Sequence, residues 1–499
     1  MNQEKRIKKI QIQHKSPLMP NFPRKSNNRV RERRRKNLFG ARILPSPTLH
    51  VPGEELMEEN DIDPFVTLFL ESSVVEQFDM LEKLAVSLSE NAAISDALYS
   101  PGFVAALVSL TEKLDGDEDA QTEITRIYWI TANLCAHNVS LRHQLMDLVP
   151  FMIKGIFDTD TIVVFYAMWA FANYITSMHE ESPEFWTNEL VSRLLSFLRC
   201  GDQKLSRTAT WTLANLLQSV LKSTYADDLK VNPADELVDE DILNQVFTAL
   251  VDGSPELILE IGNLLCIVTT HCSPEALGSL LETDFLTNMH VLQNVDFPQE
   301  FDKISAYELL LKTIGNVLSG KDEYVHSIYE YDFFPFISRC FVSSNHVVRK
   351  TAAFVVCNFL AGEDTAIIAD IVAEFPDLFD GIFLTTPTDD AIKTELAMLS
   401  GVFRQHEFLF ESLLSDYDQV VSFFKSQFDT KDGTVLEYGL QLLHHILHRV
   451  TVDGIADDII EYFALSGIED VLDRLTGVGI ERIERFSSQI MDEFFTSDE

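Results

Sequence analysis

One short pattern, Trp-x-x-Ala-Asn, occurs three times in this chain of 499 residues, at Trp129, Trp169 and Trp211. Its closing asparagines lie 40 and 42 residues apart. A weaker form follows at spacings of 48, 53 and 42 residues, in the pairs Leu259 and Asn263, Lys312 and Asn316, and Phe354 and Asn358. Self-similarity at a nearly fixed period indicates a repeat architecture, in which each unit buries its apolar face against its neighbours.

The residues between these patterns are helical in character. Apolar residues recur at spacings of three and four from about Asp63 to about Phe495, as in Phe103, Leu107 and Leu110, and strand signals are weak. Helical repeats of about 40 residues are typical of armadillo or HEAT proteins. A chain of this length is also too long for one compact core. We therefore expect an all-α solenoid built from such repeats.

Two further signals mark the limits of the repeats. Ser-Pro-Glu at Ser182, Ser254 and Ser273 predicts helix starts, because serine caps, proline fits the first turn and glutamate meets the positive end of the helix dipole. The longer asparagine spacings predict insertions, around residues 227–241 before the fifth repeat and 296–302 before the sixth.

The Trp and Asn of each pattern lie four residues apart and therefore share one helix face. Stacked helices would align these pairs in parallel rows on the concave surface. Amides there can pair with the backbone of an extended peptide, and lysine or arginine stems can slide between the indoles. This arrangement predicts a groove for basic peptides. A single such pair is more often a core or capping feature, but three at repeat spacing favour display.

Charge is distributed unevenly along the chain. Residues 1–50 hold six lysines and eight arginines against only Glu4 and Glu32, a net charge of +12, so the remainder carries −51 of the total of −39. Residues 1 to about 60 are rich in Lys, Arg, Asn, Gln and Pro, which predicts a disordered arm. A basic arm on an acidic body attracts oppositely charged partners, and salt weakens that attraction.

Neither disulfides nor a membrane span is expected. The six cysteines are scattered and lack zinc spacing, which indicates reduced core thiols, namely Cys135, Cys200, Cys266, Cys272, Cys340 and Cys357. The amino terminus has no apolar segment typical of a secretory signal. The uncharged run 161–178 approaches the length of a membrane span, but its polar residues and lack of basic flanks favour a buried solenoid helix.

The tryptophan and asparagine arrays resemble those of the importin alpha family, adaptors that carry cargo with basic nuclear localisation signals. The resemblance extends over nearly the whole chain and implies a right-handed superhelical solenoid of about ten armadillo repeats. It places the major peptide-binding site on repeats two to four and the fifth, at Trp129, Asn133, Trp169, Asn173, Trp211, Asn215, Asp252 and Glu256. It places a weaker minor site at Lys312, Asn316, Phe354 and Asn358.

The same resemblance implies roles for both ends of the chain. The cluster Arg29, Arg31, Arg33, Arg34, Arg35 and Lys36 resembles the end of the segment that binds an importin-beta carrier and also acts as an internal mimic of a localisation signal. Residues 476–499 resemble the region that engages an export receptor. The expected domains are thus an arm at 1–60, a solenoid at 61–475 and a tail at 476–499, in a protein that shuttles between cytoplasm and nucleus.

Some positions depart from the family pattern. Ser177 stands where the family has an aspartate for the most buried cargo lysine, and Glu180 or Glu181 is the available substitute. His137 and Leu141 replace the family's Gly and Thr. The stretch 396–401 in repeat eight has neither Trp nor Asn, so we expect one clear groove, mainly for monopartite signals.

Other functions remain as alternatives. An armadillo scaffold without a transport role would bind structured or acidic partners. Nucleic-acid binding by the arm is opposed by the acidic body and by the near absence of aromatic residues, only Phe22 and Phe39. No phosphate-binding loop, nucleophile elbow or metal motif suggests an enzyme or a cofactor. His444 and His448 share a helix face, but no metal motif accompanies them.

Overall fold

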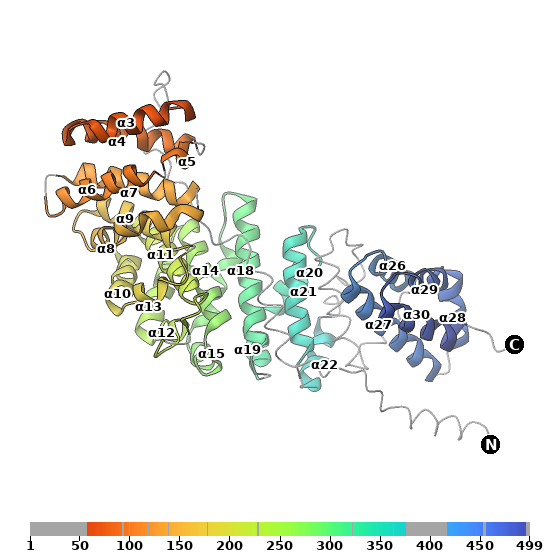
Figure 1. Ribbon diagram of the computed structural model, residues 1–499. Coiled ribbons are helices and arrows are strands. Elements are labelled where there is room, and N and C mark those ends of the chain that lie inside the picture. Colours follow the sequence, from red (N-terminus) through yellow and green to blue (C-terminus); the bar gives the residue numbers. More distant parts are fainter. Residues whose placement is uncertain are drawn as a thin grey trace. The chain divides into compact units, whose positions relative to one another are not determined.

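The computed structural model describes residues 57–495, with gaps at 92–93, 99, 118–119, 138, 177, 227–228, 322, 363, 376–416 and 453–455. Throughout these residues the chain is helical and contains no strand (Figure 1). The all-α prediction is confirmed. The basic arm cluster at residues 29–36 and the repeat-eight stretch 396–401 lie outside the described residues.

The first part of the chain forms helices η1, α3 to α11 and η2 to η4. In chain order they are η1 (Glu59–Asp61), α3 (Ile62–Glu71), α4 (Val74–Glu90), α5 (Ile94–Leu98), α6 (Pro101–Leu114), α7 (Gln121–His137), η2 (Val139–Leu148), α8 (Val149–Ile156), α9 (Thr161–Ile175), η3 (Ser182–Phe185), α10 (Asn188–Ser196), η4 (Phe197–Arg199) and α11 (Gln203–Val220).

The remaining described helices run from α12 to η7. They are α12 (Pro233–Glu236), α13 (Glu240–Asp252), α14 (Pro255–His271), α15 (Pro274–Leu281), α16 (Phe285–Met289), α17 (Val291–Asn294), α18 (Glu300–Leu318), α19 (Tyr324–Glu330), α20 (Phe334–Phe341), α21 (His346–Leu360), α22 (Thr365–Glu374), α26 (Tyr417–Gln427), α27 (Gly433–Val452), α28 (Ala456–Leu465), α29 (Ile468–Leu475), α30 (Glu481–Ile490) and η7 (Met491–Phe495).

These helices repeat in groups of two short helices and one long one. The long helices α4, α7, α9, α11, α14, α18 and α21 each pack against the next, and we call them the ladder helices. Their shared interior is mainly apolar, as in buried Leu134, Phe171, Leu213, Leu264 and Phe359, but it also holds buried polar side chains. Groups of three helices stacked in series form a solenoid of the armadillo type.

Helix starts follow the local sequence. Ser254 and Ser273 cap α14 and α15, where their hydroxyls accept hydrogen bonds from the backbone N–H groups three residues on. Asp160 and Asp202 cap α9 and α11 in the same way. A short helix, η3, does begin at Ser182 as predicted, but the serine does not cap it. Ser182 is buried as the first residue of η3, and its hydroxyl donates to the carbonyl of His179.

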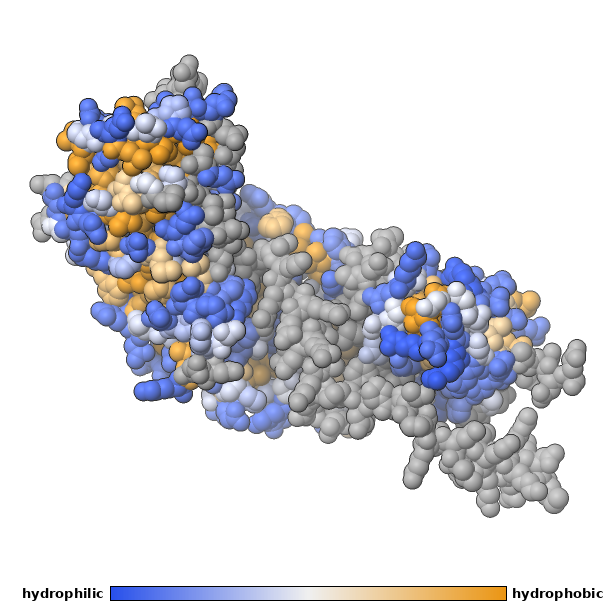
Figure 2. Space-filling view, in the orientation of Figure 1, coloured by the Kyte–Doolittle hydropathy of each residue, from blue (hydrophilic) through white to orange (hydrophobic). Residues whose placement is uncertain are grey.

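The uncharged run at 161–178 is explained by burial in the solenoid. Helix α9 is buried along nearly its whole length between α7, α8 and α11. In the part of the chain that the structure describes, no helix has the length and apolar character needed to cross a membrane. Figure 2 shows a mainly hydrophilic surface with hydrophobic patches, the largest over the helices from α3 to α9.

The C-terminal helices pack with one another. Helix α30 contacts α27 and α29, and the buried hydroxyl of Ser487 donates to the carbonyl of Leu472 over 2.8 Å. The short π-helical turn η7 continues from α30 and contacts α28 and α29. The expected division at residue 475 and the export-receptor contact stay predictions.

Replacing Gly315 by alanine should destabilise the solenoid. A Cβ at this position would lie 2.4 Å from Cε1 of Phe354 on the next ladder helix, so the buried ring must shift. Overpacking of this kind costs about 1–3 kcal/mol. Urea unfolding followed by circular dichroism should show a lower midpoint for Gly315→Ala. Gly477→Ala is the control, because a Cβ there meets nothing within 4 Å, and an equal loss in both variants would contradict the account.

Thiol labelling should separate the cysteines by burial. Burial raises the pKa of the Cys135 and Cys340 thiols to about 12, so neither forms a thiolate near pH 8. Cys200 is exposed. In the folded protein, a thiol-specific reagent followed by mass spectrometry should label Cys200 first, and Cys135 and Cys340 only after denaturation. Early labelling of Cys135 would contradict the packing of α7.

Candidate peptide-binding site

The six pattern asparagines form a buried line across the ladder helices, here called the asparagine ladder. Its members are Asn133, Asn173, Asn215, Asn263, Asn316 and Asn358, all between 0% and 6% exposed. Most donate from Nδ2 to the preceding ladder helix. Asn173 donates to the carbonyl of Ala132 over 2.8 Å, Asn215 to Ala172 over 3.3 Å, and Asn358 to Gly315 over 2.7 Å.

In these three cases the acceptor carbonyl belongs to the residue just before the preceding asparagine of the ladder. Elsewhere the ladder uses hydroxyl groups. Asn133 donates to Ser89 over 3.1 Å, and Asn316 to Thr270 over 2.8 Å. A buried amide needs a partner, and a helix that supplies one is fixed in register. The ladder therefore holds successive repeats together, a role that sequence analysis did not identify.

In two ladder amides, one side-chain atom has no hydrogen-bond partner. The Oδ1 atoms of Asn215 and Asn263 are buried and accept no hydrogen bond in the structure. Gln218 Nε2, one turn beyond Asn215, is also buried and donates none. Buried polar atoms without partners are uncommon and are costly to maintain. These atoms are enclosed by the protein and have almost no contact with solvent.

An aromatic row runs beside the asparagine ladder on α7, α9 and α11. It consists of Trp129, Tyr166, Phe165, Trp169 and Trp211. Centroids of successive rings in this order are 6.2, 5.3, 5.5 and 5.2 Å apart, all within the range of direct aromatic contact. Tyr166 and Phe165 were not predicted, although they stand three and four residues before Trp169 and so share its helix face.

The indoles are covered more than sequence analysis predicted. Trp129 and Trp211 are 5% and 1% exposed, and Trp169 is half-buried. Each of the three makes further interactions besides these ring contacts. Because Trp169 and Trp211 touch, no space remains between these two rings for a lysine stem. Trp169 keeps the most exposed surface of the three indoles.

The aromatic row already holds a cation of the chain itself. Lys204 Nζ, in the first turn of α11, lies 3.9 Å from the centroid of Phe165. An ammonium group over an aromatic face at this distance is a cation–π interaction. The contact between Lys204 and Phe165 shows that a ring of this row accepts a lysine ammonium group.

Carboxylates lie on the next ladder helix and its entry. Asp252 and Glu256 are exposed, as the predicted site requires. Hydrogen bonds from the backbone N–H of Glu256 and from Ser254 lower the pKa of Glu256, with a smaller contribution from Arg207, so it is ionised at neutral pH. Glu260, which was not predicted, is 5% exposed and its Oε1 lies 3.7 Å from Nε of Arg207 on α11. In the sequence, Glu260 could have been noticed as the one acidic residue within the apolar run 257–265.

The predicted minor site consists largely of packing contacts. Lys312 Nζ pairs with Glu308 Oε1 at 2.6 Å, one turn earlier on α18. Phe354 is buried, and its ring occupies the space left by Gly315. Asn316 and Asn358 belong to the ladder. Whether peptides bind here stays a prediction.

The positions that depart from the family pattern are placed as follows. Ser177 lies outside the described residues, as does the side chain of Leu141. The imidazole of His137 is hydrogen-bonded to the carbonyl of Leu88 over 2.8 Å. Glu180 is exposed and accepts a hydrogen bond from Thr224, and Glu181 is half-buried.

Histidine positions give no sign of a metal centre. Among the described residues, no group of three or more His, Cys, Asp or Glu side chains is placed to hold a metal ion. His444 Nε2 instead lies 3.1 Å from Glu493 Oε2, and its ring is 6.4 Å from that of His448. The hydrogen bond from His444 lowers the pKa of Glu493.

Comparison with known proteins bears on the fold. No protein-family model and no curated protein matches the sequence. An engineered protein solved by the Northeast Structural Genomics Consortium is similar in structure, with a TM-score of 0.66 at 18% identity, over 88% of this chain and 100% of its own. The two chains therefore share a fold.

Designed armadillo repeat proteins are also similar, over about half of this chain. One has a TM-score of 0.43 at 18% identity and covers 51% of this chain and 99% of its own. Another, solved in complex with the peptide (KR)4, has a TM-score of 0.43 at 15% identity, with the same coverage.

Removing one ladder amide should weaken the stacking of repeats. Asn173→Ala leaves the buried carbonyl of Ala132 without its side-chain donor and opens a small cavity. We expect a loss of about 1–3 kcal/mol in the free energy of unfolding, measured by urea titration. Asn244→Ala, at an exposed position of α13, is the control. Equal stability of the Asn173 variant and the wild-type chain would contradict a bracing role.

Proposed function

We propose that the chain binds extended, lysine- and arginine-rich peptides along the ladder helices, and acts as a nuclear-import adaptor. The observation that carries the proposal is the aromatic row running beside the asparagine ladder on α7, α9 and α11. Rings provide faces for cations, and amides pair with the backbone of an extended chain.

Three features support this reading. Lys204 over Phe165 is an example of the cation–π contact that a cargo lysine would make. The unpartnered Oδ1 atoms of Asn215 and Asn263 would accept peptide N–H groups once the side chains that enclose them move aside. The ionised Glu256, with Asp252 one turn before it, supplies negative charge at the end of the row. A basic peptide would thus meet rings, amides and carboxylates in succession.

In our proposal, the basic arm with its cluster at residues 29–36 serves as an internal pseudo-substrate and binds an importin-beta-like carrier. Capture of the arm would then free the groove for cargo, so that carrier and cargo binding reinforce each other. Contact of the C-terminal region with an export receptor, and shuttling between cytoplasm and nucleus, belong to the same proposal.

An armadillo scaffold without a transport role is the second candidate. The direct contact between Trp169 and Trp211 and the burial of Phe354 favour it, because both observations give the pattern residues a packing function. Such a scaffold would bind partners elsewhere on its surface and would not require the aromatic row.

Removing residues 1–50 should raise the affinity for a labelled Lys/Arg-rich peptide, measured by fluorescence anisotropy at physiological salt. Typical couplings of this kind are about 5- to 150-fold. Trp169→Ala in the shortened chain should then weaken binding by about 0.5–2 kcal/mol through loss of cation–π contact.

Phe301→Ala is the matched control, because it removes an exposed aromatic ring that lies outside the row. Unchanged affinity after removal of residues 1–50 would dismiss autoinhibition. Unchanged affinity of the Trp169 variant would favour the scaffold.

A further inference from the structure

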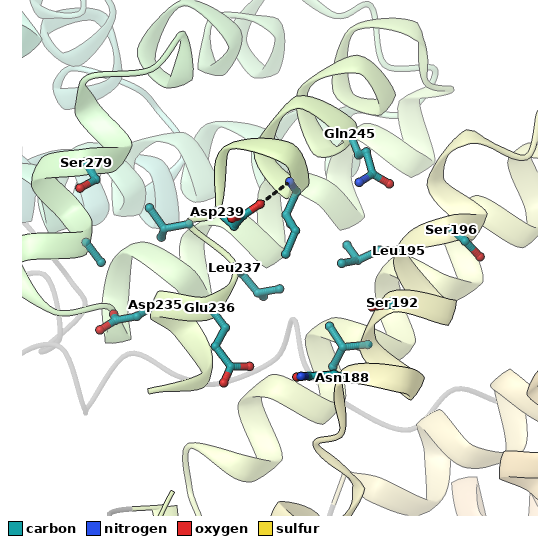
Figure 3. Close-up of a pocket in the computed structure, with 14 residues that line it drawn as sticks. Asn188, Ser192, Leu195, Ser196, Asp235, Glu236, Leu237, Asp239, Gln245 and Ser279 are labelled. Atoms are coloured by element: carbon teal, nitrogen blue, oxygen red, sulfur yellow. Dashed lines mark hydrogen bonds between the residues drawn. The ribbon is translucent and has the colours of Figure 1, made fainter. Parts of the chain in front are cut away.

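A groove of about 800 Å³ lies on a different set of helices from the ladder (Figure 3). We call it the insertion groove. Helices α10, α12, α13 and α15 and the residues joining α12 to α13 line it, and no ladder helix contributes a residue. Figure 3 shows Ser192 and Leu195 on the α10 side and Leu237 and Asp239 on the opposite side. Its volume falls in the range typical of ligand-binding clefts.

The groove coincides with an irregularity in the repeat. Asn215 and Asn263 are 48 residues apart, whereas the preceding ladder spacings are 40 and 42, and sequence analysis places an insertion at 227–241. The first helix of this repeat, α12, is a single turn of 4 residues, as is η3 in the preceding repeat, whereas α15 in the next repeat has 8. The end of α12 and the residues that join it to α13, from Asp235 to Asp239, line the groove.

The insertion groove combines an apolar floor with an acidic rim. Its apolar lining consists of the half-buried residues Val238, Ile242 and Ala276 and the buried residues Val191, Leu195 and Leu237. Three carboxylates line its edge, those of Asp235, Glu236 and Asp239. Apolar surface bounded by charge of one sign is the complement of an amphipathic ligand of the opposite sign.

The three carboxylates are held in place by uncharged donors. Asp235 accepts from the backbone N–H of Ser273 over 2.7 Å, and Glu236 from Nε1 of Trp186 over 2.8 Å. Asp239 caps α13 and accepts from the first N–H groups of that helix. Among the described residues, no lysine or arginine forms an ion pair with any of the three. Their charges are therefore fixed in position and not neutralised by a basic side chain.

We propose that the insertion groove binds a basic amphipathic helix of a partner protein. Val191 and Leu195 lie one turn apart on α10 and line one side of the groove, where each keeps only a small exposed area. A helix lying between α10 and α13 buries its apolar face on this floor, in the mode of helix-in-groove recognition. Its lysines and arginines then reach Asp235, Glu236 and Asp239 at the rim.

The test uses the full-length chain and a labelled helical peptide of about 18 leucines and lysines, with leucines at helical spacing. A second peptide has the same composition in an order that has no apolar face. The groove variant is Asp235→Asn with Asp239→Asn, because asparagine retains the acceptor oxygen of Asp235 and is an equally good helix cap at 239. The matched control is Glu240→Gln with Asp241→Asn, which removes two charges from exposed residues of the same segment outside the groove.

Anisotropy titration at physiological salt should show the amphipathic peptide binding more tightly than the permuted one. The groove variant should bind it about tenfold more weakly, and the control within roughly twofold of wild type. Ser192→Trp, which fills the groove from α10, should abolish binding, and Phe301→Ala, at an exposed position outside the groove, should leave it unchanged. Trp169→Ala reports any binding to the aromatic row.

Several results would overturn the proposal. Equal binding of both peptides, or equal weakening in the groove and control variants, would mean that the peptide binds through the overall negative charge of the chain and not through the groove. Loss in the Trp169 variant alone would move the peptide to the ladder helices. Binding seen only after removal of residues 1–50 would assign the groove to the chain's own arm and not to a partner.

Discussion

The stacking of one ladder helix on the next is the contact on which the rest of the structure depends. A single three-helix repeat cannot enclose a core, so each one is stable only through its neighbours. Small residues beside the asparagines, such as Ala132, Ala172 and Gly315, let adjacent helices approach closely, and the ladder amides then bond to their carbonyls. Register and spacing along the array follow from this contact.

Sequence periodicity was sufficient to predict the fold, because helical phasing and a 40-residue period restrict a chain of this length to a helical solenoid. Local capping signals at Ser254 and Ser273 were also reliable. Handedness and the total number of repeats stay predictions. Ser182 shows the limit of such signals, since tertiary packing there uses the hydroxyl differently.

The site was harder to predict than the fold. A spacing of four residues shows that a Trp and an Asn share a helix face. How far the side chains of that face are buried depends on the distance to the next helix, which the sequence does not give. That distance puts Trp169 against Trp211, inserts Phe354 into the space at Gly315 and turns several ladder amides toward carbonyls of the preceding helix. Glu260 and Lys204 acquire their roles from partners about 40 or more residues away.

The two surfaces divide between different helices. Ladder helices carry the aromatic row and the asparagine ladder, and the insertion groove is built by the shorter helices of the fourth to sixth repeats. Both present negative charge near apolar surface, and so both are suited to basic partners. Because no lining residue is shared, occupation of one surface does not by itself exclude a ligand from the other.

The decisive experiment is a structure of the chain with a bound Lys/Arg-rich peptide. The peptide should lie extended across α7, α9, α11 and α14, with backbone N–H groups donating to Oδ1 of Asn215 and Asn263. Its basic side chains should lie on the outer faces of the aromatic row. A peptide seated away from these helices, or one whose backbone makes no bond to the ladder amides, would contradict the proposed binding site.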